Sequence, residues 1–175
     1  MAWQEYLAGL SASAVGLAQA YGLFGIFLGS LIANATIFLP VPFDLVVFGL
    51  GATSQDFLWP LWVGIAAGLG AGLGELSGYY LGLLGRHAVQ KRLPKDQLEK
   101  VDHFRNEVRH RGMYLLFVTS LVPFPFDLVG IASGLIKYPV ERFLFAVSLG
   151  KIGKHVILCY AGYLGLSAIR ALFGF

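Results

Sequence analysis

Pro40-Val41-Pro42-Phe43-Asp44-Leu45-Val46 recurs 83 residues later as Pro123-Phe124-Pro125-Phe126-Asp127-Leu128-Val129, and six of the seven residues are identical. Each copy places two prolines, which cannot continue a regular helix, shortly before an ionisable Asp in an otherwise apolar stretch. A carboxylate in so apolar a setting is costly in lipid and marks a functional site by default. Its duplication predicts two broken-helix units, interrupted at Pro40 and Pro42 and at Pro123 and Pro125, that meet at one binding site.

The composition is that of an integral membrane protein. Of the 175 residues, 57% are hydrophobic and 13% are charged, whereas a soluble domain carries about 25% charged residues. The mean hydropathy is +0.69. The single cysteine, Cys159, cannot form an intrachain disulfide and says nothing about the redox compartment. No signal peptide is expected, because the N-terminus carries no basic residue.

The basic residues are concentrated in one segment. No Lys or Arg precedes Arg86, and eight of the thirteen lie between Arg86 and Arg111. The positive-inside rule places this segment on the cytoplasmic side of a multi-pass protein, which we expect in the plasma membrane. Membrane topology explains the cluster better than nucleic-acid binding, so no nucleic-acid partner is expected.

The first half reads as an interfacial helix followed by a hairpin and a spanning helix. Residues 1–20 are weakly amphipathic and are expected to lie at the membrane surface. In the first repeat, 21–85, the apolar run before the prolines is close to the ~20 residues that a span needs, but the run after Asp44 is too short. This pattern predicts a re-entrant helical hairpin that returns to its own side. Phe57–Gly85 is then a full span with a stripe of glycines at 70, 74, 78 and 82 for tight packing.

The second half repeats this pattern. Residues 86–112 form a basic amphipathic cytoplasmic linker, and 113–170 form the second repeat, with a hairpin over 113–136 and a span over 143–169. Because one crossing separates the hairpins, they enter from opposite faces. The predicted fold is therefore an all-α membrane domain, an inverted repeat of two re-entrant hairpins, each followed by a spanning helix, with amphipathic surface helices.

Three acids are the strongest functional candidates. Asp44 and Asp127 follow the breaks, where each could bind a proton, cap the helix that begins there, or do both. Glu75 lies in the middle of the first spanning helix. It either faces a cavity and exchanges protons, or forms a packing hydrogen bond to Ser77 or to a neighbouring helix.

Polar residues on other segments could complete a site. Lys151, Lys154 and His155 lie at i, i+3 and i+4 and so share one helix face. They could pair with the three acids or bind an anionic head group, or they could snorkel to the interface. Asn34 and Ser120 precede the two breaks and either line a polar cavity or bond carbonyls within their own helices. No residue spacing matches a metal site or a catalytic set, so no metal, cofactor or enzymatic activity is expected.

The chain resembles the DedA family of membrane proteins, also called the SNARE-associated or VTT-domain family. The resemblance covers residues 21 to about 166. It rests on Tyr21-Gly22, Gly25-Ile26-Phe27, Leu39-Pro40-Val41-Pro42-Phe43-Asp44, Gly51, Gly74-Glu75, Gly78-Tyr79, Gly82, Pro123, Gly134, Arg142-Phe143, Gly150 and Gly162-Tyr163-Leu164-Gly165.

This resemblance implies two re-entrant hairpins in an inverted repeat and lipid traffic across the bilayer, with protons implicated in bacterial members. Asp44 and Glu75 match acidic positions of the family. The chain departs from the family pattern in two places. Ala33-Asn34 stands where a Glu is frequent, and Ser120 and Phe126 stand near the positions of two arginines in the second hairpin.

These observations favour a flippase or scramblase for an anionic phospholipid or polyprenyl phosphate, either coupled to protons or passive. In this hypothesis Lys151, Lys154 and His155 attract the phosphate, while Asp44, Asp127 and Glu75 exchange protons. Two alternatives stay open: a proton- or cation-coupled transporter of a small solute, and a non-transporting membrane assembly or stress factor. The glycine stripe is compatible with a homodimer.

Overall fold

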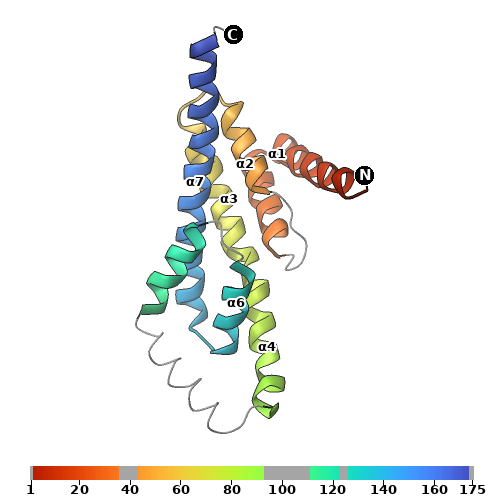
Figure 1. Ribbon diagram of the computed structural model, residues 1–175, viewed down its shortest axis with the longest axis vertical. Helices are drawn as coiled ribbons and strands as arrows, with labels where there is room; N and C mark the ends of the chain where they lie inside the picture. The colour runs from red at the N-terminus through yellow and green to blue at the C-terminus, as the bar shows by residue number, and fades with distance from the viewer. Residues whose placement is uncertain (1, 36–42, 93–110, 123–125, 174–175) are drawn as a thin grey trace.

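The computed structural model describes the backbone of residues 2–35, 43–92, 111–122 and 126–173, and the side chains of residues 16, 18, 20–35, 43–86, 111–122 and 126–165. All regular structure in these ranges is helical (Figure 1). The helices are α1 Ala2–Ala35, α2 Phe43–Ala52, α3 Trp59–Gly74, α4 Leu76–Arg92, α6 Phe126–Leu135 and α7 Val140–Phe173. Residues 111–121 form a further helical segment.

Within the described ranges, two helical stretches are long and apolar enough to cross a membrane. Trp59–Arg86 spans α3 and most of α4 with 28 residues, and Val140–Gly165 in α7 has 26. The later part of α1, α2 and α6 are apolar but shorter. The spanning helix expected over Phe57–Gly85 is divided at Glu75, and α4 continues past the expected end to Arg92. The rest of the predicted basic linker, 93–110, lies outside the described residues, as do the four prolines of the predicted breaks.

A sharp kink divides α1. Gly22 has φ +57° and ψ −135°, a conformation that residues with a side chain rarely adopt. The kink falls beside the boundary that the sequence predicted between 1–20 and the first repeat. The helix before it projects from the body of the molecule, and the helix after it runs beside α3 (Figure 1).

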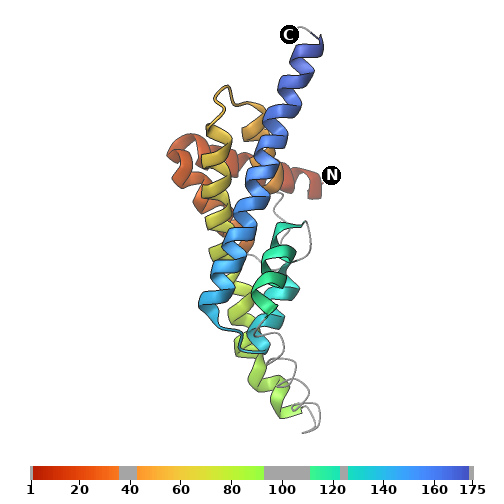
Figure 2. The same ribbon diagram turned by 90° about the vertical axis from the view of Figure 1, so that its left-hand side faces the viewer.

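Each helix of the second half runs in the opposite direction to its counterpart in the first half (Figures 1 and 2). The later part of α1 runs with α3, because Gly70 lies against Phe27 and Gly74 against Leu31. α2, which lies between them in the sequence, runs the other way. In the second half the segment 111–121 and α7 run against α3, while α6, between them in the sequence, runs in the same direction as α3.

Each short helix packs on the long helix of the other half. The contacts are backbone to backbone at glycines and are matched between the two pairs: Gly51 on Cys159 and Gly162 on Phe48 between α2 and α7, and Gly134 on Tyr79 and Gly82 on Ile131 between α6 and α4. The α6 residues follow their α2 counterparts by 83 positions, and the α7 residues follow their α4 counterparts by 80. The sequence repeat is therefore also a repeat of packing.

Two apolar clusters form the core. One gathers around Phe43 and Val47 of α2, and the other around Phe126 of α6 and Phe143 of α7. Phe43 and Phe126 occupy the same place in the sequence repeat, and they are 3% and 4% exposed. Each anchors the start of a short helix, so the adjacent Asp44 and Asp127 are fixed at the inner ends of α2 and α6.

The glycine stripe at 70, 74, 78 and 82 serves two different neighbours. Gly70 and Gly74 face α1, whereas Gly78 and Gly82 face α6. A second stripe at 64, 68 and 72 lies against Val156, Ile152 and Ser148 of α7. This second stripe brings the two longest apolar stretches into backbone contact.

The α3–α7 contact predicts a sharp difference between two Gly→Ala changes. A Cβ at Gly68 would lie 2.3 Å from the Cα of Ile152, whereas a Cβ at Gly49 meets nothing within 4 Å. Because overpacking costs about 1–3 kcal/mol, we expect Gly68→Ala to lower the unfolding temperature in detergent. The matched change Gly49→Ala should leave it unchanged or slightly raised, since Ala favours helix. Equal unfolding temperatures for the two variants would contradict the packing.

Candidate functional site

A buried ion pair joins α7 to the α3–α4 junction. Lys151 Nζ lies 2.5 Å from Glu75 Oε1, and the two side chains are only 7% and 4% exposed. The other carboxylate oxygen, Oε2, is buried and has no hydrogen-bond partner among the described residues. Ser77, the expected alternative partner of Glu75, also has a hydroxyl without a partner there. The structure thus pairs Glu75 with a cation rather than with its helix neighbour.

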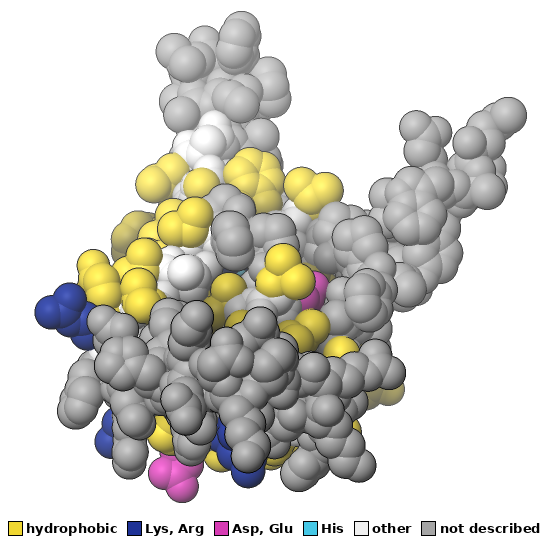
Figure 3. All heavy atoms as spheres, turned by 60° about the horizontal axis from the view of Figure 1, so that its bottom comes forward, with side chains coloured by type: hydrophobic (Ala, Val, Ile, Leu, Met, Phe, Trp, Pro, Cys, Tyr) yellow, Lys and Arg dark blue, Asp and Glu magenta, His cyan; other side chains and the backbone are white. Residues whose placement is uncertain are grey.

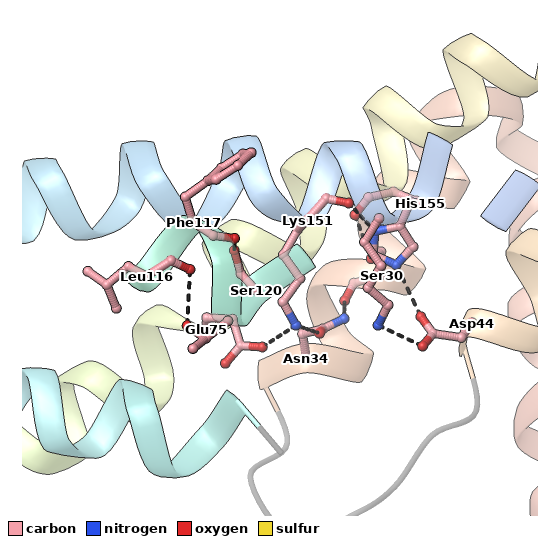
Figure 4. Close-up of polar contacts among 12 residues, drawn as sticks. Ser30, Asn34, Asp44, Glu75, Leu116, Phe117, Ser120, Lys151 and His155 are labelled. Atoms are coloured by element: carbon pink, nitrogen blue, oxygen red, sulfur yellow. Dashed lines mark hydrogen bonds and ion pairs between the residues drawn. The ribbon is translucent and has the colours of Figure 1, made fainter. Parts of the chain in front are cut away.

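Asn34 extends this pair to α1. Its Oδ1 accepts from Lys151 Nζ at 3.1 Å, and its Nδ2 donates to the carbonyl oxygen of Ser30 at 2.8 Å (Figure 4). Ser30, which the sequence reasoning missed, donates its hydroxyl to the carbonyl oxygen of Ala67 on α3 at 2.7 Å. The amide of Asn34 is therefore oriented by its neighbours to offer its oxygen to the ammonium group.

A second group of charges lies one turn along α7. Asp44 Oδ2 is 2.7 Å from Lys154 Nζ, and Oδ1 is 3.3 Å from His155 Nε2. Asp44 is in the first turn of α2, where the helix dipole also favours a carboxylate. The His155 side chain is 1% exposed, but that of Asp44 is 47% exposed. The group therefore connects the buried interior with the surface of the helix bundle.

The contacts of His155 place its two ring nitrogens against a carbonyl oxygen and a carboxylate oxygen. Nδ1 lies 2.8 Å from the carbonyl oxygen of Lys151, which can only accept, so Nδ1 carries a hydrogen. A neutral ring would then turn an unprotonated Nε2 toward an ionised carboxylate, and two acceptors would face each other. The contact is favourable only when a hydrogen is on Nε2 or on the carboxyl group. The geometry therefore suits a hydrogen bond between His155 Nε2 and the Asp44 carboxylate.

Asp127 lies close to the first ion pair without joining it. Its backbone oxygen is near Gly78, and Gly130 of the same helix lies against the Glu75 backbone. Among the described residues it has no ion-pair partner within 4 Å. The neighbouring Phe126 ring lies 5.4 Å from Lys151 Nζ, a distance that permits a cation–π contact. The acid is thus placed beside Glu75 and Lys151 on the start of α6.

The remaining candidates from the sequence are Ser120 and the four prolines of the predicted breaks. Ser120 is buried and donates its hydroxyl to the carbonyl oxygen of Phe117 at 2.9 Å, which is the alternative role expected for it. It lies against Gly150 and does not contact the three cations. Pro40, Pro42, Pro123 and Pro125 lie outside the described residues. Within the described part of the chain, no three His, Cys, Asp or Glu side chains are grouped to hold a metal ion.

Comparisons with known proteins identify one family and several relatives. A family model described as the VTT domain matches residues 41–164. This range includes every charged residue of the two groups but not Asn34. An uncharacterized protein of Methanocaldococcus jannaschii is 26% identical over 140 residues, covering 79% of this chain and 82% of that protein. An uncharacterized membrane protein of Synechocystis sp. is 29% identical over 156 residues, covering 85% and 70%.

A relative with a different kind of name is equally similar. An alkaline phosphatase-like protein of Lactococcus lactis subsp. cremoris is 28% identical over 151 residues, covering 81% of this chain and 70% of that protein. No solved structure matches the chain.

The Glu75–Lys151 pair predicts non-additive mutational effects. Because Glu75→Gln or Lys151→Met alone leaves a buried charge without its partner, each should destabilise the protein by about 3–5 kcal/mol. The double variant should cost much less than the sum of the two, since no buried charge is left unpaired. Unfolding of all four proteins in the same detergent measures the coupling. Strictly additive losses would mean that the two groups do not interact.

Proposed function

This chain belongs to the VTT domain family of membrane proteins, and we propose that it moves an anionic lipid across the bilayer as a flippase or scramblase. The lipid is a phospholipid or a polyprenyl phosphate, which share a phosphate head group. The observation that carries the proposal is the set of charges along α7, in which Lys151 pairs with Glu75, and Lys154 and His155 pair with Asp44. Lys151, Glu75 and His155 are buried, whereas Asp44 reaches the surface. Such charges are expensive in a membrane and contribute little net stability, so their presence points to function.

The proposed architecture is an inverted repeat of two re-entrant hairpins. The first repeat, 21–85, and the second, 113–170, are joined by the linker 86–112 on the cytoplasmic side. The opposite orders of helix direction and the matched glycine contacts of α2–α7 and α6–α4 support this arrangement. α2 and α6 are too short to cross a bilayer, which fits arms that turn back inside it. The charged groups then lie where the two hairpins meet.

The three cations of α7 are the proposed contacts of the phosphate. Each is held by an acid in the present structure, so a phosphate group would compete with Glu75 for Lys151 and with Asp44 for Lys154. Exchange of one anionic partner for another keeps each cation neutralised throughout, which lowers the cost of passage through a low-dielectric region. Asn34 supports the same exchange, because its oxygen continues to accept from Lys151 when Glu75 is displaced.

Protons are the proposed coupling ions. The Asp44–His155 contact is the proposed carrier of an exchangeable proton. In the described ranges, Glu75 Oε2 has no hydrogen-bond partner and Asp127 has no ion-pair partner. Protonation of an acid releases its cation for the phosphate, and deprotonation recaptures it. This sequence links the movement of the head group to the movement of a proton.

Head-group translocation in proteoliposomes tests the proposal. We expect wild-type protein to move fluorescent phosphatidylglycerol between leaflets and the rate to change with an imposed pH gradient. Asp44→Asn should abolish this movement, because the amide cannot hold the His155 proton or neutralise Lys154. Asp127→Asn should also reduce it strongly. The matched control is Asp56→Asn in the exposed loop before α3, which should transport like wild type.

The outcomes separate the candidate functions. Loss in Asp44→Asn with no effect of the gradient on wild type would support passive scrambling. Normal lipid movement in both Asp44→Asn and Asp127→Asn would contradict the proposal. Proton flux driven by a small solute in vesicles without anionic lipid would favour a solute transporter. Thermal unfolding of each variant in detergent confirms that any loss is not a loss of folding.

A further inference from the structure

An apolar groove separates the two helices of the second hairpin. It has a volume of about 380 Å³ and lies between the segment 111–121 and α6. Its walls are mostly aliphatic side chains: Leu115, Leu116, Leu128, Val129, Ala132 and Ile136. One end reaches Leu128, the residue after Asp127, so the groove begins beside the charged groups of α7. The other end reaches Gly112 and Tyr138.

The polar groups within the groove are already satisfied. Thr119 donates to the carbonyl oxygen of Leu115 at 2.7 Å, and Ser133 donates to that of Val129 at 2.7 Å. A polar solute would find no partner along these walls and would lose its hydration there. A hydrocarbon chain has no such requirement. The lining therefore fits the tail of a lipid rather than a small polar molecule.

The end of the groove at Tyr138 has the opposite character. The Tyr138 hydroxyl is buried and has no hydrogen-bond partner among the described residues. Three exposed cations stand next to this end: Arg111 precedes Gly112, Lys137 precedes Tyr138, and Arg142 follows in the first turn of α7. Figure 3 views the molecule from this end, with Lys and Arg side chains at its edge beside hydrophobic ones.

We propose that this groove is a lipid-binding site that receives one hydrocarbon tail of an anionic lipid. Arg111, Lys137 and Arg142 bind the head group at the rim, and the Tyr138 hydroxyl donates to it. Basic groups between helices at the cytoplasmic surface are known to bind anionic head groups in this way. The inference rests on the proposed function and deepens it, because a lipid held here has its head group at one end of the hairpin and its tail extending toward Asp127 and the charged groups of α7.

Photolabelling with defined lipids tests the site. The reconstituted full chain is illuminated in phosphatidylcholine vesicles that contain phosphatidylglycerol with a photoactivatable group in its acyl chain, and labelled peptides are identified by mass spectrometry. We expect label on 111–121 and α6. Ala132→Trp fills the groove and should remove this label and slow transport. Ala161→Trp, the same change at an exposed site on α7, should do neither.

The basic rim has its own test. Arg111→Gln, Lys137→Gln and Arg142→Gln should each lower labelling by phosphatidylglycerol about fivefold, since one cation near an anionic group contributes about that factor. Labelling by the same probe on phosphatidylcholine should stay unchanged. The charge-conserving variants Arg111→Lys, Lys137→Arg and Arg142→Lys should keep most of the labelling. Equal labelling by the two lipids would overturn the site and would mean that these cations only snorkel to the interface.

Failure of this site and failure of the proposed function give different results. Wild-type labelling and transport in Ala132→Trp, with transport lost in Asp44→Asn, would overturn the groove and leave the transport proposal standing. Selective labelling of the groove in a wild-type protein that moves no lipid would support the binding site and contradict the transport proposal.

Discussion

The positive charge of Lys151 is the constraint on which the surrounding structure depends. Its side chain is 7% exposed, and an unpaired ammonium group at such a depth would cost several kcal/mol, so Glu75 must reach it. That distance is short only because the α3 glycines at 64, 68 and 72 allow α7 to approach backbone to backbone. Asn34, near the end of the described part of α1, accepts a hydrogen bond from the same ammonium group. One ion pair thereby ties together α1, the α3–α4 junction and α7.

The two halves share a packing plan but differ in charge. His155 follows Glu75 by 80 positions, the same offset that relates the glycine contacts of α7 and α4. Asp44 and Asp127 are related by the other offset. In one half an acid therefore faces a base, and in the other an acid lies beside an acid. Two neighbouring acids, Glu75 and Asp127, are unfavourable unless a cation or a proton lies between them. Lys151 pairs with Glu75 and lies near Phe126, the residue before Asp127.

The sequence predicted the helices and their polar faces better than the contacts between side chains. The duplicated break and its Asp were visible because the residues are nearly identical, and the spacing of Lys151, Lys154 and His155 correctly placed them on one face. Spacing could not tell which acid each cation would meet: Lys151 pairs with Glu75, the other two with Asp44, and Asp127 is not paired in the described residues. Ser30 was missed because a hydroxyl in an apolar helix usually bonds its own helix, whereas this one bonds α3. Such contacts depend on which helices pack together, and local patterns do not encode that.

The balance of charges around α7 favours a proton-linked form of transport. If His155 carries a proton, the three cations balance their two partner acids and the nearby Asp127, and a neutral group is the least costly one to bury. Loss of that proton leaves a net negative charge, which would repel an anionic head group. Arrival of a head group adds a negative charge, which would favour uptake of a further proton at an acid such as Asp127. Because coupling between two binding equilibria is reciprocal, the proposed anion and proton would each promote the binding of the other. A purely passive path has no need of such coupling, and a polar cavity lined with neutral side chains would serve it at a lower cost.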